Sequence, residues 1–148
     1  MTAPWPPIAE LLPHRPPMIL LDRLVEFAPG RALCAVEIRP DSPFVDNGRL
    51  RSLVAIEYMA QAVAAYAGML AHQAGRRPNL GFLLGTRELK LEVPELHAGD
   101  ALEVEVVHQF GDSQLGSFRC AVRRGPEAVA QAVLTVYQRP GEGGFALP

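Results

Sequence analysis

The hydrophobic and polar positions of the chain change their spacing sharply at one stretch. From Leu53 to His72, twenty residues run without Pro, Ser, Thr, Asn or Asp, and Ala, Leu and Met dominate them. These residue types are strong helix formers, and a helix that is apolar almost all round packs inside a protein rather than on its surface. We therefore predict one continuous buried helix over 53–72, with Ser52 as its N-cap.

The small and polar residues of this predicted helix fall on one narrow stripe. At about 100° per residue, the stripe consists of Glu57, Gln61, Ala64, Gly68 and His72. Glu57 is the one formal charge in the stretch, and a buried carboxylate is costly unless it is paired or neutralised. Two interpretations of Glu57 stay open on this pattern, a functional group or a satisfied structural one.

Most of the remaining chain is typical of strands joined by short turns. Strands are predicted over 18–27, 31–39, 80–84, 86–93, 101–110, 115–124 and 128–139, with a bulge at Gly85 and a short N-terminal helix over 8–12. Consecutive strands with tight turns pair antiparallel, and the long helix has no second helix layer to pack against. A curved antiparallel sheet wrapped around the helix buries it. This α+β arrangement is the hotdog fold.

Composition and charge limit the domain count and the partners. The chain has 148 residues, 49% of them hydrophobic, and a net charge of −2 with no basic run. We expect a single domain over 1–148, with a proline-rich segment over 1–17 and a loose tail over 140–148. The charge balance argues against nucleic acid as a partner.

The compartment follows from the N-terminus, the long helix and the cysteines. The N-terminus lacks the pattern of a signal peptide. The long helix contains Glu57, Gln61 and seven alanines, so we expect a core helix and no membrane span. Cys34 and Cys120 lie in apolar runs without a CxxC or Cys/His cluster. The sequence therefore predicts a cytoplasmic protein without a metal or cofactor.

Four segments of the chain carry a family resemblance. In order, they read LLPHRPPMILLDRLVE, PDSPF, IEYMAQA and FLLGTRELKLEVPELHAGD. Together they resemble the FabZ/FabA-type (3R)-hydroxyacyl-acyl carrier protein dehydratases, and DSPF, IEYMAQ and GFLLGTR look most like the small ApeP-like dehydratases of aryl polyene pathways. The resemblance covers roughly residues 8 to 138. It implies a homodimer of hotdogs, or a larger assembly of such dimers, with acyl sites at the subunit interface served by acyl carrier protein.

One departure from this family concerns its catalytic histidine. FabZ-type enzymes place that histidine in a His-Phe-x-Gly segment before the helix, whereas this chain reads PFVDNGRLRS and contains no histidine there. Glu57 carries over by position. Asp46 and Asn47, in the loop where the family histidine would lie, are weaker candidates for substrate contact.

Dehydration of a 3-hydroxyacyl thioester needs an acid for the leaving hydroxyl, a base for the α-proton and donors for the carbonyl. We expect Glu57 to serve the hydroxyl and Gln61 to fix its rotamer. Backbone N–H groups at the start of the helix, around Ser52 and Leu53, are expected to hold the carbonyl.

The base must come from elsewhere in the chain. His72 lies about 22 Å from Glu57 along the helix, and His97 and His108 have turn-like or surface-like flanks. His14 is the remaining candidate, and we expect it to approach Glu57 of the partner chain. The alternative is that the LPHR segment only anchors the N-terminal turn, because FabZ-type enzymes carry it in addition to their catalytic histidine.

Three functions stay open at this point. The first is a 3-hydroxyacyl-acyl carrier protein dehydratase that uses Glu57 and a relocated histidine, in fatty acid or polyene biosynthesis. The second is a hotdog thioesterase, in which the same carboxylate activates water. The third is a non-catalytic subunit that binds acyl chains or pairs with an active dehydratase, an alternative supported by the missing His-Phe-x-Gly segment.

Overall fold

The computed structural model describes residues 4–112 and 114–139, so the predicted tail over 140–148 lies outside the described residues. The elements, in chain order, are α1 (Ile8–Leu11), β1 (Arg23–Ala28), β2 (Arg31–Glu37), β3 (Arg49–Arg51), the 3₁₀ turn η1 (Ser52–Val54), α2 (Ala55–Gln73), β4 (Gly81–Leu91), β5 (Glu95–His97), β6 (Ala101–Gly111), β7 (Leu115–Arg124) and β8 (Glu127–Gln138). Six strands form one sheet in the order β1-β2-β6-β7-β8-β4, and β3 pairs with β5. All of these pairs are antiparallel.

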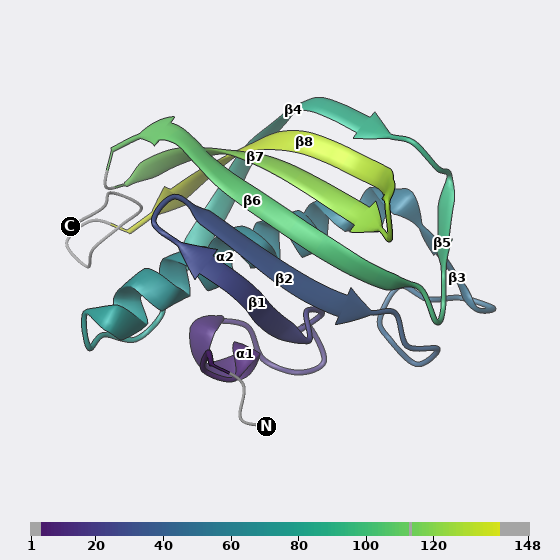
Figure 1. Cartoon of the computed structure of the whole chain (residues 1–148), viewed down its shortest axis with the longest axis horizontal. Coiled ribbons are helices and arrows are strands. Elements are labelled where there is room, and N and C mark those ends of the chain that lie inside the picture. The colour runs from purple at the N-terminus through teal and green to yellow at the C-terminus, as the bar shows by residue number, and fades with distance from the viewer. Residues whose placement is uncertain (1–3, 113, 140–148) are drawn as a thin grey trace.

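The six-stranded sheet curves over α2, which crosses its concave side (Figure 1). Large side chains of the helix, among them Tyr58, Met59 and Tyr66, are almost fully buried. The segment Ser52–Gln73 is long and apolar enough to span a membrane by length and composition, but 61% of its most apolar window is buried inside the protein. Packing against the sheet therefore accounts for the apolar character of this helix.

The start of the long helix differs from the prediction. Residues 52–54 form a 3₁₀ turn before the α-helix begins at Ala55. Ser52 is not the N-cap, since Arg51 holds that position for the 3₁₀ turn and Val54 holds it for α2, both without a side-chain capping bond. Instead, the Ser52 N–H donates to the carbonyl oxygen of Pro94 at 3.1 Å. A tertiary contact with the β5 region thus replaces the expected local cap.

Two segments that lie outside the predicted strands also form strands. β3 lies within 40–52 and β5 within 94–100, and they form a two-stranded ribbon in which Leu50 faces Leu96. Each strand has only three residues, too few for an alternating pattern to be visible in the sequence. The predicted bulge at Gly85 is present, because the register of β4 against β8 shifts between Leu83 and Gly85.

The strand β4 lies at one edge of the sheet and carries apolar side chains to the surface. Every residue of β4 is at least partly exposed. The large apolar residues involved, between 38% and 59% exposed, are Phe82, Leu83, Leu84, Leu89 and Leu91. A long, apolar edge strand is a site where another chain pairs unless something covers it.

Candidate active site

Glu57 lies in the first turn of α2 and is held by its neighbour one turn further along. Gln61, which is fully buried, donates from Nε2 to Oε1 of Glu57 at 3.0 Å. The same Nε2 donates to the Met18 carbonyl oxygen at 2.7 Å, and Gln61 Oε1 accepts the N–H of Leu20 at 2.9 Å. The predicted Gln61–Glu57 hydrogen bond is therefore present. In addition, the Gln61 amide fastens the segment that precedes β1 to the helix.

This anchoring explains why the first strand is shorter than predicted. We expected a strand from Met18, but β1 begins at Arg23. The backbone groups of Met18 and Leu20 bond to the Gln61 side chain rather than to a neighbouring strand. The apolar side chains of this stretch still enter the core, with Leu20 and Leu21 both buried.

His14 meets Glu57 of the same chain. Its Nε2 lies 3.8 Å from Oε1 of Glu57, and the two side chains are 28% and 36% exposed. The Nδ1 atom of His14 is buried and has no hydrogen-bond partner among the residues that the structure describes. Nε2 is therefore the ring nitrogen that can reach Glu57. The structure thus brings His14 to the carboxylate of its own chain, and the expected approach to Glu57 of the partner chain stays a prediction.

A close helix contact sets the position of His14. The short helix α1 packs against α2, and a Cβ added at Gly68 would collide with the carbonyl oxygen of Leu11. The absence of a side chain at Gly68 thus lets the α1 backbone approach α2 closely. Because His14 follows Leu11 by three residues, this contact brings the imidazole to the helix face that carries Glu57.

Glu57 and His14 line one narrow cleft with a volume of about 170 Å³. Its helix side consists of small residues, including Ala60, Ala64 and Ala67, and the strands β4 and β8 contribute Leu83 and Val136. Of the stripe recognised in the sequence, Glu57 and Ala64 line this cleft, whereas Gln61 is buried beside Glu57 and Gly68 packs against Leu11. An extended, mainly apolar ligand is the kind of molecule that such a cleft accepts.

The other predicted site residues lie outside this cleft. Ser52 and Leu53 line a different surface hollow beside Pro94. The Ser52 N–H is occupied by Pro94 and its side chain is buried. The Ser52 N–H therefore cannot donate to a substrate carbonyl as expected, because it already donates to the carbonyl oxygen of Pro94. The next backbone N–H at the start of η1 belongs to Leu53, whose side chain is 55% exposed.

Asp46 and Asn47 line a third, open hollow of about 420 Å³ together with Val54. Asp46 is engaged with its own loop, since its backbone forms an isolated bridge with Arg49. The structure therefore does not bring these two residues into the cleft of Glu57 and His14. Their contact with a substrate stays a prediction.

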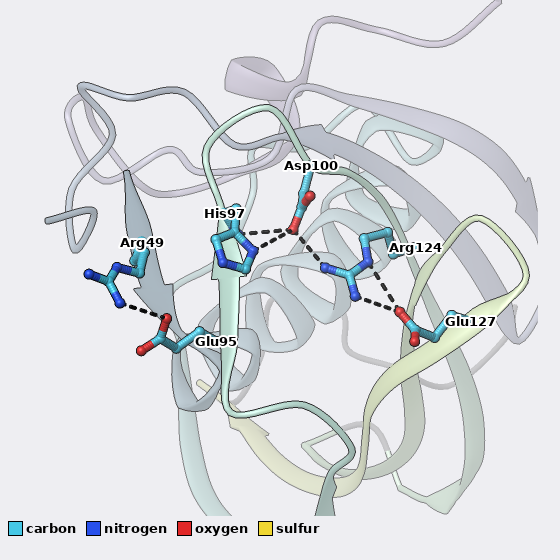
Figure 2. A network of polar contacts seen from close by, with 6 residues as sticks. All are labelled: Arg49, Glu95, His97, Asp100, Arg124 and Glu127. Carbon is cyan, nitrogen blue, oxygen red and sulfur yellow. Dashed lines mark hydrogen bonds and ion pairs between the residues drawn. The ribbon is translucent and has the colours of Figure 1, made fainter. Parts of the chain in front are cut away.

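A polar network supports the region just before α2. Figure 2 shows its members, Arg49, Glu95, His97, Asp100, Arg124 and Glu127. Arg124 bonds to Asp100 at 3.0 Å and to Glu127 at 2.6 Å, which ties the β7–β8 turn to the start of β6. Arg49 lies 3.8 Å from Glu95 across the β3–β5 ribbon. These contacts hold the ribbon that leads into η1.

The other three histidines do not line the cleft that contains Glu57 and His14. His72 is exposed at the end of α2, His97 belongs to the polar network, and His108 stacks on Phe118. Within 4–112 and 114–139, no group of three or more His, Cys, Asp or Glu side chains is arranged to hold a metal ion. The expected absence of a metal and of a cofactor stays a prediction.

Two residues with amide side chains in the cleft were not anticipated from the sequence. Asn79 and Gln138 line it together with Gly81. They come from the loop before β4 and from the end of β8, and Gln138 pairs with Gly81 in the sheet. No local motif marks them, because only the pairing of β4 with β8 brings them beside the helix.

A curved antiparallel sheet around one helix defines the hotdog fold, and in this chain a carboxyl and an imidazole face an apolar cleft beside the helix. A family comparison gives the particular group. The sequence model of the ApeP-like family, described as ApeP dehydratase, matches residues 6–145. The chain therefore belongs to the ApeP-like dehydratase family.

Individual relatives agree with this assignment. The chain is 28% identical over 141 residues to the 3-hydroxyacyl-[acyl-carrier-protein] dehydratase FabZ of Psychromonas ingrahamii, covering 89% of this chain and 91% of the relative. It is 31% identical over 134 residues to FabZ of Natranaerobius thermophilus, with 86% and 92% covered. The dehydratase heterocomplex ApeI:P from Xenorhabdus doucetiae contains a chain of 29% identity and TM-score 0.87, with 91% and 92% covered. The predictions of a hotdog fold and of a FabZ-like and ApeP-like dehydratase are confirmed.

Proposed function

We propose that Glu57 and His14 together dehydrate a 3-hydroxyacyl thioester, carried on acyl carrier protein, to the trans-2-enoyl thioester. The observation that supports this proposal is the 3.8 Å separation of His14 Nε2 and Glu57 Oε1 at one apolar cleft. A carboxyl and an imidazole supply the acid and the base that the reaction needs. In FabZ-type enzymes the imidazole comes from the His-Phe-x-Gly segment. In this chain, which lacks that segment, the N-terminal segment supplies it through His14.

The bond changes balance with these two groups alone. Neutral His14 takes the proton from the carbon next to the thioester carbonyl, and the electron pair of that C–H bond becomes the new carbon–carbon double bond. The C–O bond at the third carbon breaks, and its hydroxyl leaves as water after accepting a proton from the Glu57 carboxyl. The proton on His14 then returns to the Glu57 carboxylate, either directly or through one water molecule.

A donor must also hold the thioester carbonyl while charge develops on it. We assign this role to the N–H of Leu53, because the first N–H groups of a helix have no partner within it. Leu53 lies about one turn before Glu57, on the same stretch of backbone. Ser52 is dropped from this role because its N–H already donates to Pro94.

We further propose that the protein works as an assembly joined through β4, as a homodimer or a larger set of dimers. The exposed apolar side chains of β4 support this proposal. The cleft also borders β4 through Gly81 and Leu83, so a partner at this edge would close it. Light scattering at micromolar concentration should show no monomer-sized species, and a purely monomeric protein would overturn the assembly.

We place the reaction in the cytoplasm. Two observations support this location. Cys34 and Cys120 are both free and buried, which suits a reducing compartment, and the one helix among the described residues that could span a membrane is packed inside the sheet.

A second function is favoured by one observation. The similar chain from Xenorhabdus doucetiae belongs to the dehydratase heterocomplex ApeI:P. This chain would then be the subunit that binds acyl chains and completes an active partner, without carrying out the reaction by itself.

Product mass from a 3-hydroxyacyl-acyl carrier protein separates the alternatives. Loss of one water supports the proposed dehydratase, and loss of the acyl group identifies a thioesterase. If the mass does not change with this protein alone but water is lost once a second hotdog dehydratase is added, the subunit function holds. That last result requires the added enzyme alone to be slower than the mixture.

A further inference from the structure

The cleft that begins at the acid–base pair ends at two amide side chains. Gln138 and Asn79 both line it. Gln138 is the last residue of β8 and is only 5% exposed, so its polar side chain is largely removed from water. The helix residues of the cleft beyond Glu57, in contrast, are alanines and a valine. The lining therefore changes from apolar to polar along its length.

The amides lie away from the reacting pair. Ala67, which also lines the cleft, follows Glu57 by ten residues, which corresponds to about 15 Å along a helix. The strand β8 and the helix α2 run toward the same end of the molecule (Figure 1). Gln138 ends β8 and therefore belongs to the far end of the cleft, where the tail of an acyl chain would lie.

The glycine beside Gln138 lines the cleft as well. A Cβ built on Gly81 would lie 3.4 Å from the carbonyl oxygen of Tyr137 and 3.8 Å from both Cγ of Gln138 and Cγ1 of Val136. These are ordinary van der Waals contacts, so the stem of Gln138 lies directly beside Gly81 in the wall of the cleft.

We propose that Gln138 determines specificity by recognising acyl chains whose far end carries a hydroxyl or carbonyl group. An amide offers two N–H donors and one oxygen acceptor, so it can bind either group even when another partner uses part of this capacity. A plain methyl end would displace water from a largely buried amide without replacing its hydrogen bonds, which is unfavourable. This inference rests on the proposed function, because it concerns the acyl chain of the same substrate.

The test compares two 3-hydroxyacyl thioesters of equal chain length, one ending in a methyl group and the other in a hydroxymethyl group. The wild-type protein should favour the hydroxyl-ended substrate by about 10-fold in kcat/KM, the weight of one hydrogen bond. Gln138→Leu should abolish this preference, and Gln138→Met provides an unbranched apolar replacement if the leucine variant folds poorly. Gln131→Leu is the matched control, because Gln131 lies on the same strand but does not line the cleft.

Binding gives a second readout that does not require turnover. The corresponding saturated thioesters, measured by calorimetry, should show the same preference and the same loss in Gln138→Leu. Equal treatment of both ligands by the wild-type protein, or an unchanged preference in a folded Gln138 variant, overturns the inference. Selective binding without any dehydration would leave the inference standing and overturn the proposed function instead.

Discussion

The Nε2 atom of His14 lies 3.8 Å from Oε1 of Glu57, so the N-terminal segment and the first turn of α2 meet at one point of the cleft. A protonated carboxyl that donates to the leaving hydroxyl cannot also remove the α-proton. In the reaction that we propose, the two residues therefore depend on each other.

Glu57→Gln and His14→Ala should each lower the rate of dehydration by about 10²-fold or more, the usual weight of an acid or base. The double variant should lose little beyond either single change, because groups that act as a unit are not additive. Steady-state kinetics measures the loss, and circular dichroism checks that the fold survives. His97→Ala is the control, since His97 does not line the cleft. Full activity in His14→Ala would place the base elsewhere.

Gln61→Met should reduce both stability and turnover. It removes hydrogen bonds to Glu57, Met18 and Leu20, and it leaves the two backbone groups without their side-chain partner. We expect a loss of about 1–3 kcal/mol in the free energy of unfolding, measured by urea denaturation. Turnover should fall with little change in KM, because Glu57 loses its orientation. An unfolding free energy equal to that of the wild type would contradict this account.

Gly68→Ala tests the contact that positions His14. The added methyl group would collide with the carbonyl oxygen of Leu11, so α1 must move away from α2. Overpacking of this kind costs about 1–3 kcal/mol, and the displaced His14 should lower activity as well. Gly85→Ala is the matched control, since a Cβ there meets nothing within 4 Å. Equal free energies of unfolding for the two variants would show that α1 accommodates the added methyl group and would contradict this account.

The sequence reveals the parts of this fold that depend on long periodic segments. The apolar stretch over 53–72 and the alternation over 101–110 are each long enough to identify their elements. Glu57 and Gln61 are four residues apart and therefore share one face of the helix wherever the helix begins. The short strands β3 and β5 escape detection, because three residues carry no period. Gln138 escapes for a different reason: only the pairing of β4 with β8 brings it to the cleft.

His14 illustrates an intermediate case. Elimination among the four histidines selects it, but no sequence pattern states which chain's Glu57 it approaches. Within the chain, the contact of Gly68 with Leu11 and the bonds of Gln61 to residues 18 and 20 bring the N-terminal segment to α2. Glycine and glutamine at these positions are readable in the sequence, whereas their distant backbone partners are not.

The two cysteines should be unreactive in the folded protein. Burial raises the pKa of both Cys34 and Cys120 to about 12, and the thiolate is the nucleophilic form of cysteine. Iodoacetamide at pH 8 should therefore label neither residue in native protein and both residues in urea, as measured by intact mass. Cys34→Ala should reduce the urea labelling to one site. Rapid labelling of native protein would show that one of the strands opens readily.

Stability should decrease in mild acid because of His108. Burial lowers the pKa of His108 from its ordinary value of 6.5, so the unfolded chain binds the proton more readily than the folded chain does. Well above pH 6.5, His108 is neutral in both states and does not affect the free energy of unfolding. As the pH falls through 6.5 toward the folded-state pKa, the unfolded chain takes up the proton first, so the free energy of unfolding decreases. Urea melts at pH 7.5 and 5.5 should show this loss. His108→Phe, which keeps an aromatic ring against Phe118, should show a smaller loss, and an equal loss in both proteins would exclude His108 as the cause.

Synthesis and folding run in opposite order at the N-terminus of this chain. The segment that contains Leu11 and His14 leaves the ribosome first, yet its packing partner Gly68 and its anchor Gln61 are made only when α2 is synthesised. Contacts between distant parts of a chain form only after the intervening loop has closed. The segment that contains Leu11 and His14 is therefore among the last to reach its native position. A nascent chain that stops before α2 contains the imidazole of His14 but lacks the residues that hold it in place.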